Sequence, residues 1–162
     1  MSLKPTSLFL FIIILNSFLL QAQQRKTAEF GNPTQSEFSL FKYQKDPTAN
    51  GVVLFESGKN YVEIVDNYIR LIKEVHRKIK VFDAKNFKHA TVEIPFYHDG
   101  DVSEKVVKLK ALTHNNTIKT YVASDAFYTT DETPNWSLKK FAFPNVKDGS
   151  ILEYTYRIES PY

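Results

Sequence analysis

The sequence contains no cysteine among its 162 residues. A disulfide, a thiol nucleophile and the lipid-modified cysteine of an exported lipoprotein all need that residue, so all three are excluded within this chain. The sequence also has no internal repeat and no low-complexity tract. Its composition, with 43% hydrophobic and 24% charged residues, is that of an ordinary globular domain.

The chain also lacks a run of basic residues. It has 21 Lys and Arg against 18 Asp and Glu, which gives a formal net charge of +3 spread along its length. Nucleic-acid binding depends on a basic patch or stripe that neutralises phosphates. The sequence therefore gives no support for a nucleic-acid partner, and it identifies no cofactor.

An apolar stretch covers residues 8–20, after Lys4, and it is too short to cross a membrane. A transmembrane helix needs roughly 20 apolar residues. The stretch ends in the letters LQAQ around Ala22, a small residue typical of signal-peptide cleavage. We predict that residues 1–22 are a signal peptide, that the protein is exported, and that no stable membrane anchor remains after cleavage.

Residues 23–50 form a predicted N-terminal segment with a short helix and a linker. Thr34 and Glu37 fit a capping box, in which each side chain satisfies a backbone donor of the other residue. This pattern predicts a short helix that carries Phe38 and Phe41. The Pro, Asn and Gly content of residues 45–51 predicts a turn or linker after it.

Residues 51–162 are predicted to form one mainly β domain. Short runs rich in Val, Ile, Tyr and Phe alternate with turn residues at fairly regular spacing. Residues 57–60 and 66–67 are predicted turns. The predicted strands cover residues 52–55, 61–65, 68–82, 90–97, 105–113, 117–122, 138–143 and 152–159. We expect an antiparallel β-sandwich with a short N-terminal helix, because crossover helices for a parallel sheet are missing.

Two of the predicted strands have patterns that allow a more specific prediction. Residues 68–82 fit both a helical and an extended pattern, and the density of β-branched residues favours a strand. In the last strand, apolar residues from Leu152 to Ile158 alternate with polar ones from Glu153 to Glu159, which predicts one face in water. The turn signal at Asp148 and Gly149 predicts a hairpin that joins residues 138–143 to this strand.

Polar residues that could hold a metal or perform catalysis are weakly patterned. The densest cluster contains His89, His98, Asp99, Asp101 and Glu104. Their spacing matches neither a calcium loop nor a zinc site, so a solvated turn is the preferred interpretation.

Paired carboxylates are another possible catalytic arrangement. Glycoside hydrolysis would need two acids held about 5 to 9 Å apart. Glu93, Glu153 and Glu159 are instead expected on the polar faces of strands. A hydrolase using paired acids is therefore the weakest of the functional hypotheses.

The single tryptophan, Trp136, lies near Phe127 and Tyr128 in the predicted fold. These three residues are candidates for an aromatic platform that binds a sugar ring or a peptide, or for an interdomain contact. The alternative, which we favour, is that Trp136 caps the core, because large aromatic side chains are mostly buried. Exposure of Trp136 beside a groove would favour binding, and burial would favour a scaffold.

Three ordered blocks of sequence resemble one known family. They are residues 45–56 (KDPTANGVVLFE), residues 74–80 (EVHRKIK), and residues 135–141 (NWSLKKF) continuing through 144–146 (PNV), 149–150 (GS) and 153–154 (EY). Together they resemble the domain of unknown function that precedes a transglutaminase-like domain in exported proteins of Gram-negative bacteria. The likeness covers most of residues 28–162.

The resemblance implies a β-sandwich module in the periplasm or at the cell surface, with no catalytic residues of its own. In the family a Cys-His-Asp constellation would lie in the downstream domain, so we expect this chain to be an N-terminal fragment that is not an enzyme. We expect it to position or recruit substrate for that downstream domain. A cell-surface domain that binds carbohydrate or peptide is the alternative. The sequence does not indicate an oligomeric state.

Overall fold

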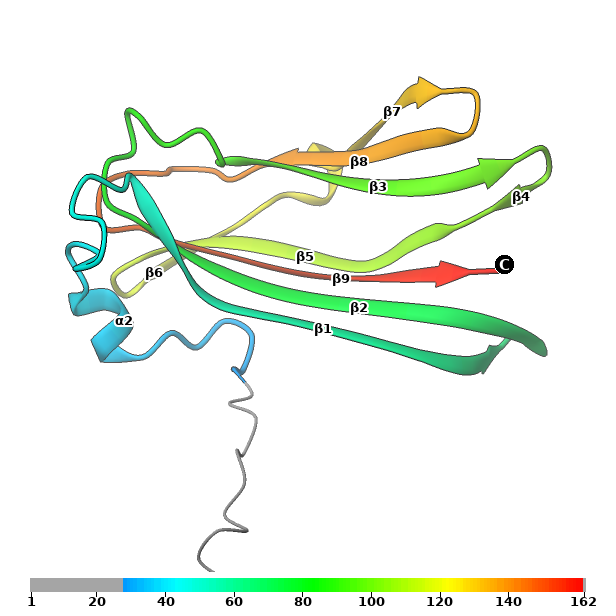
Figure 1. Ribbon diagram of the computed structural model, residues 1–162, viewed down its shortest axis with the longest axis horizontal. Helices are drawn as coiled ribbons and strands as arrows, with labels where there is room; N and C mark the ends of the chain where they lie inside the picture. The colour runs from blue at the N-terminus through cyan, green and yellow to red at the C-terminus, as the bar shows by residue number, and fades with distance from the viewer. Residues whose placement is uncertain (1–27, 162) are drawn as a thin grey trace, which may run out of the picture.

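The computed structural model describes residues 28–161, which form two antiparallel sheets (Figure 1). The five-stranded sheet has the order β1-β2-β9-β5-β6, and the four-stranded sheet has the order β4-β3-β8-β7. The elements are α2 (Gln35–Ser39), β1 (Gly51–Val65), β2 (Tyr68–Val81), β3 (Thr91–Asp99), β4 (Val102–Ser103), β5 (Lys105–Asn115), β6 (Ile118–Tyr121), the 3-10 turn η1 (Ser124–Ala126), β7 (Tyr128–Thr133), β8 (Trp136–Ala142) and β9 (Ile151–Ser160). The prediction of a mainly β chain with antiparallel sheets and a short N-terminal helix is confirmed.

One apolar core lies between the two sheets. Val81 and Leu152 from the five-stranded sheet are fully buried, and so is Phe141 from the four-stranded sheet. Fully burying a side chain of this size contributes roughly 1.5 to 3 kcal/mol. Figure 1 shows the two sheets close together near the start of β1 and farther apart toward the turn between β1 and β2.

The capping box that was predicted from sequence is present at α2. The Thr34 hydroxyl accepts a hydrogen bond from the Glu37 backbone N–H at 3.3 Å, and the Glu37 carboxylate accepts one from the Thr34 N–H at 2.6 Å. These two bonds satisfy donors that a helix leaves free at its start.

The predicted turn at residues 57–60 is wrong, because β1 continues through it. Ser57 pairs with His76 and Asn60 pairs with Lys73, within a ladder that runs to Val65. The long partner strand β2 supplies backbone partners for these polar residues, and this pairing outweighs their turn propensity. The predicted turn at Asp66 and Asn67 is confirmed, and both residues have the positive φ that a tight hairpin needs (52° and 66°).

The extended interpretation of residues 68–82 is confirmed by β2. The predicted strands at residues 105–113 and 117–122 are confirmed by β5 and β6, which pair as a hairpin. The predicted hairpin between residues 138–143 and the last strand is wrong. β8 pairs with β3 and β7, whereas β9 pairs with β2 and β5 in the other sheet. Asp148 and Gly149 therefore lie in a connection between sheets, and the φ of 84° at Gly149 serves that crossing.

The last strand does not have one face in water, which corrects the expectation from its alternating pattern. Glu153 has no exposed surface and Arg157 is 6% exposed. β9 is the central strand of its sheet, with β2 on one side and β5 on the other. The N-terminal strap, defined here as residues 28–41, contacts the outer face of this sheet and covers Glu153. Arg157 is paired instead with Glu63, Glu74 and Glu159.

The predicted signal peptide, residues 1–22, lies outside the described residues. Within residues 28–161, no helix combines the length and apolar character needed to span a bilayer.

Candidate functional site

The three aromatic residues predicted as a binding platform are placed differently from one another. Trp136 is 45% exposed and Tyr128 is 51% exposed, whereas Phe127 packs edge-on against the core residue Phe141, with ring centroids 5.3 Å apart. Tyr128 pairs with Lys140, four residues along β8 from Trp136, a separation of about 13 Å at 3.3 Å per residue. The three side chains therefore do not form one continuous platform.

The expectation that Trp136 caps the core is wrong. Trp136 lies at the start of β8, on the strand face opposite to buried Phe141. Its ring contacts the edge of Tyr97 with centroids 5.3 Å apart. Trp136 therefore has the exposure expected for a binding residue, and it lines neither of the two hollows described below.

The three acids considered for paired-acid chemistry do not converge. Glu93 is exposed on β3 in the four-stranded sheet, and Glu153 is buried in the other sheet. Glu159 lies six residues from Glu153 along β9, about 20 Å away at 3.3 Å per residue. This distance exceeds the roughly 5 to 9 Å that glycoside hydrolysis needs. The prediction that Glu153 lies on the surface is wrong, because the strap and two histidines enclose it.

Glu153 is the centre of a buried polar network beneath the strap. Its two carboxylate oxygens lie 2.7 Å from Nε2 of His76 and 2.8 Å from Nε2 of His114, and the Gly31 backbone N–H donates to it at 2.9 Å. An ionised carboxylate can only accept hydrogen bonds, so Nε2 carries the proton on both rings. The strap adds ring contacts from Phe30 to His76.

This network keeps Glu153 ionised inside the protein. Burial alone would raise the pKa of its carboxyl group, but hydrogen bonds from His114, His76 and Gly31 outweigh burial and lower the pKa to about 2. No hydroxyl group is hydrogen-bonded to either histidine within the described residues. The network therefore has the components of a stable anchor for the strap and lacks an activated nucleophile.

Two buried lysines complete the contact between strap and sheet. Lys78 Nζ donates to the Glu37 carboxylate at 2.9 Å, and Lys80 Nζ donates to the backbone carbonyls of Phe38 and Gly149 at 2.9 and 2.7 Å. Burial lowers the pKa of Lys80. In addition to the Glu153 network, two lysines of the sheet therefore bind the strap, Lys78 through an ion pair and Lys80 through a hydrogen bond.

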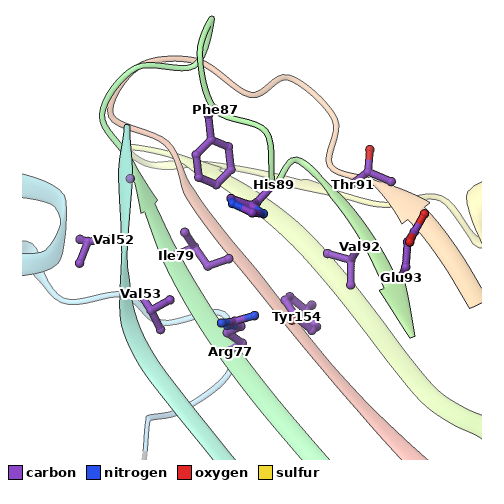
Figure 2. Close-up of a pocket in the computed structure, with 11 residues that line it drawn as sticks. Val52, Val53, Arg77, Ile79, Phe87, His89, Thr91, Val92, Glu93 and Tyr154 are labelled. Atoms are coloured by element: carbon purple, nitrogen blue, oxygen red, sulfur yellow. The ribbon is translucent and has the colours of Figure 1, made fainter. Parts of the chain in front are cut away.

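A second feature is a cleft of about 420 Å³ between the first strands of the two sheets (Figure 2). Figure 2 shows Phe87 and His89 at one end, and Arg77 and Tyr154 deeper between the strands. The lining residues come from β1, β2, β3, β9 and the loop before β3, namely Gly51, Val52, Val53, Arg77, Ile79, Phe87, His89, Thr91, Val92, Glu93 and Tyr154.

Gly51 allows the cleft to close at this end. A Cβ atom at this position would lie 2.7 Å from the Lys80 carbonyl oxygen and 2.8 Å from the Phe87 ring. Only glycine lets the ring and the backbone of the neighbouring strand approach so closely.

Arg77 is the main source of charge inside the cleft. Its cross-strand partners are Tyr154 and Glu56, and its guanidinium lies 3.4 Å from the exposed Glu56 carboxylate. Hydrogen bonding to the Tyr154 phenol, followed by smaller contributions that include the charge of Glu56, raises the pKa of Arg77 above its usual range. The buried Nε atom has no hydrogen-bond partner within the described residues.

Arg77 was missed as a functional candidate in the sequence, although a signal was there. It interrupts the apolar alternation Val75, Ile79, Val81 on the strand face that turns toward the core. A charge in such a row is costly unless it is paired or used.

A third feature is a hollow of about 500 Å³ on the outer face of the five-stranded sheet, beside the strap. Lys59, Lys108 and Lys110 lie around it, and a bulge in β5 gives Lys108 a φ of 51°. Its arginine, Arg157, is already paired with Glu63 at 2.6 Å and with two further acids. Because three acids already balance the charge of Arg157, the hollow is a weaker candidate than the cleft.

A fourth feature is an exposed apolar surface at the end of the β1–β2 hairpin. Val62 and Ile64 are 66% and 72% exposed, and their cross-strand partners Leu71 and Ile69 are 46% and 72% exposed. Because side chains two residues apart share a face, these four lie together on the side that faces the core farther along β2. We call them the hairpin-tip patch.

The polar cluster at residues 89–104 does not come together as a ligand set. His98 Nε2 lies 3.0 Å from the Ser137 hydroxyl, and Glu104 accepts a hydrogen bond from the Tyr97 N–H at 2.9 Å. Across residues 28–161, no three His, Asp or Glu side chains are grouped so that they could hold a metal ion.

Comparisons with known proteins give little further information. No protein-family model matches the chain, and no curated protein matches it. A crystal structure described as "a putative protease from Parabacteroides distasonis ATCC 8503" resembles 56% of this chain at 13% sequence identity, with a TM-score of 0.47. The matched region is 20% of that protein's chain, and the likeness is too distant to support an argument about function.

Proposed function

We propose that this chain is a non-catalytic β-sandwich module of an exported protein, and that it positions or recruits substrate for a transglutaminase-like domain that follows it. The observation that carries the proposal is the hairpin-tip patch. Scattered exposed aliphatic residues are common on protein surfaces, but a contiguous cluster is typical of an interaction site. Here two directly paired couples, Val62 with Leu71 and Ile64 with Ile69, form such a cluster.

The position of the patch supports a neighbouring domain as its occupant. Ser160, the last residue of β9, pairs with Leu71 of the patch. A polypeptide that continues beyond β9 leaves the sheet beside these side chains. A domain tethered at this point has a high effective concentration at the patch, so modest apolar contact is enough to hold it there.

The buried network supports the non-catalytic part of the proposal. Glu153, His76 and His114 satisfy one another beneath the strap, with no reactive hydroxyl hydrogen-bonded to them in the described chain. The alternative, a carbohydrate- or peptide-binding domain that uses Trp136, is favoured by the exposure of that residue. Neither the cleft nor the hollow beside the strap is lined by Trp136.

The test compares this chain alone with a longer protein in which the proposed transglutaminase-like domain follows it. We expect backbone amides at residues 62–71 to exchange hydrogen at least about tenfold more slowly in the longer protein, because docking buries the patch. Ile64→Ser combined with Ile69→Ser should restore fast exchange in the longer protein. In the isolated chain each of these two substitutions should change the free energy of unfolding by less than about 0.5 kcal/mol, since both side chains are exposed.

Ile118→Ser is the matched control, because Ile118 is 64% exposed on β6 and lies outside the patch. Equal exchange at residues 62–71 in the two proteins would contradict docking at the patch. A downstream reading frame without a Cys-His-Asp domain would contradict the proposed partner.

A further inference from the structure

Arg77 occupies a position where a structural residue would be apolar. On β2 it lies between Val75 and Ile79, on the face that packs toward the second sheet. A guanidinium there loses part of its hydration and needs compensating partners. The single carboxylate beside it, that of Glu56, is 53% exposed and 3.4 Å away, and the buried Nε of Arg77 has no hydrogen-bond partner in the described part of the chain.

The cleft around Arg77 has the size and chemistry of a ligand site. Its volume of about 420 Å³ lies within the usual range of about 300 to 1,000 Å³ for ligand pockets. Val53 and Val92 form apolar walls on either side of it, and Phe87 closes one end (Figure 2). Glu93, the acid among the lining residues, is paired with Lys140 at 3.2 Å. Apart from the Tyr154 phenol, the partner of the Arg77 cation is therefore the exposed Glu56 carboxylate, which an incoming anion can replace.

The strands that flank the cleft have free backbone edges. β1 is the end strand of its sheet, and in the described chain β3 is paired on this side at its far end, where His98 and Asp99 pair with β4 and Tyr97 is hydrogen-bonded to Glu104. An extended chain laid along such an edge can form main-chain hydrogen bonds while alternate side chains enter pockets. This geometry favours a peptide over a compact small molecule.

We propose that this cleft binds an extended peptide segment, with an acidic side chain paired to Arg77 and apolar neighbours packed on Val53 and Phe87. A ligand carboxylate would take the place of Glu56 at the guanidinium of Arg77. Exposed ion pairs such as that of Arg77 with Glu56 are weak, so the exchange costs little. The inference is separate from the proposed docking of a downstream domain, because the cleft and the hairpin-tip patch lie at opposite ends of β1.

The experiment titrates the isotopically labelled full chain with short peptides and follows its amide resonances. The probe is acetyl-Val-Glu-Val-amide, with the Val-Gln-Val and Val-Lys-Val peptides as matched controls. We expect saturable shifts at residues 51–54, 77 and 92 with the acidic peptide. The glutamine peptide should bind about tenfold or more weakly, because hydrogen bonds to charged groups are worth more than those to neutral ones.

Three substitutions assign the effect to Arg77. Arg77→Gln should weaken binding of the acidic peptide by about tenfold or more, whereas Arg70→Gln on the same strand should leave it unchanged. Glu56→Gln removes the competing carboxylate and should tighten binding roughly two- to fivefold. This gain cannot result from a folding defect, so it remains informative even if Arg77→Gln reduces stability.

Several results would overturn the proposal. Equal affinity for the Glu and Gln peptides would exclude a charge-specific site, and unchanged affinity in Glu56→Gln would exclude competition at Arg77. If isovalerate alone bound as tightly as the acidic peptide, the site would bind small acids and the peptide assignment would be wrong. None of these results would affect the exchange test at the hairpin-tip patch.

Discussion

Replacing Glu153 by glutamine tests the network that fixes the strap to the sheet. The substitution keeps the size of the side chain and removes its charge. In the folded protein the pKa of this carboxyl group is lowered from an ordinary 4.5 to about 2. Since each unit of pKa corresponds to about 1.4 kcal/mol, the ionised form contributes roughly 3 kcal/mol of stability at neutral pH. We expect Glu153→Gln to lose most of that amount at pH 7.

The dependence on pH has a definite sign. Because the folded-state pKa is depressed, the contribution is fully present above about pH 4.5 and is lost as the pH falls toward 2. The difference between the wild-type protein and Glu153→Gln should therefore shrink from roughly 3 kcal/mol at pH 7 to under about 1 kcal/mol at pH 2.5. Other carboxylates that titrate in this range are present in both proteins, so to a first approximation they cancel in the comparison.

The assay is urea unfolding followed by far-ultraviolet circular dichroism at several pH values. Glu159→Gln is the control, because Glu159 lies on the same face of β9 and shares Arg157 with other acids. A change of less than about 1 kcal/mol is expected there. If Glu153→Gln were as stable as the wild-type protein at pH 7, or if its deficit were the same at pH 7 and pH 2.5, the assignment of stability to this network would be refuted.

Three further outcomes follow from the same contacts. Gly51→Ala should lower the unfolding free energy by about 1 to 3 kcal/mol in a urea titration, because its methyl group would collide with Phe87 and a backbone carbonyl, and an unchanged midpoint would count against that close approach. A double-mutant cycle of Glu37→Gln and Lys78→Met should give a coupling energy of roughly 1 to 2 kcal/mol, and additive effects would show that strap and sheet are not linked there. Fluorescence of Trp136 should be quenched readily by acrylamide, and protection from the quencher would contradict its 45% exposure.

The sequence correctly predicted those elements that depend on a few neighbouring residues. The capping box at Thr34 and Glu37 needs only four consecutive residues, and the turn at Asp66 and Asn67 needs only two that tolerate positive φ. Both were identified from the sequence. The long strand β2 was identified because β-branched residues are dense along it.

Pairing between distant segments could not be predicted in the same way. Residues 57–60 have the composition of a turn, but β2 extends opposite them and holds them in the ladder. Glu153 has the position of a surface residue in an alternating strand, but a segment more than a hundred residues away covers it. The alternation of β9 correctly separated its two faces. It could not show that the polar face would be enclosed, because that depends on the strap.

The candidate cleft was hidden for a related reason. Arg77 was visible in the sequence as an interruption of an apolar row, but its neighbours Tyr154 and Phe87 come from other parts of the chain. Trp136, in contrast, was proposed as a site residue from the sequence. Its chemistry suggested a site, and its place at the start of β8 gives it exposure, but it does not line the cleft. The charged residue that interrupts an apolar row, Arg77, was therefore a better indicator of a site than the aromatic character of Trp136.

The separation of the two proposed surfaces limits how they could act together. Val53 at the cleft and Val62 at the hairpin-tip patch are nine residues apart on β1, about 30 Å at 3.3 Å per residue. At this distance substitutions at the two surfaces should be additive in stability. A peptide anchored at Arg77 and extended along β1 would need about nine further residues to reach a domain docked at the patch. Recruitment through the cleft would therefore select long, extended substrates that carry an acidic residue far from the point of reaction.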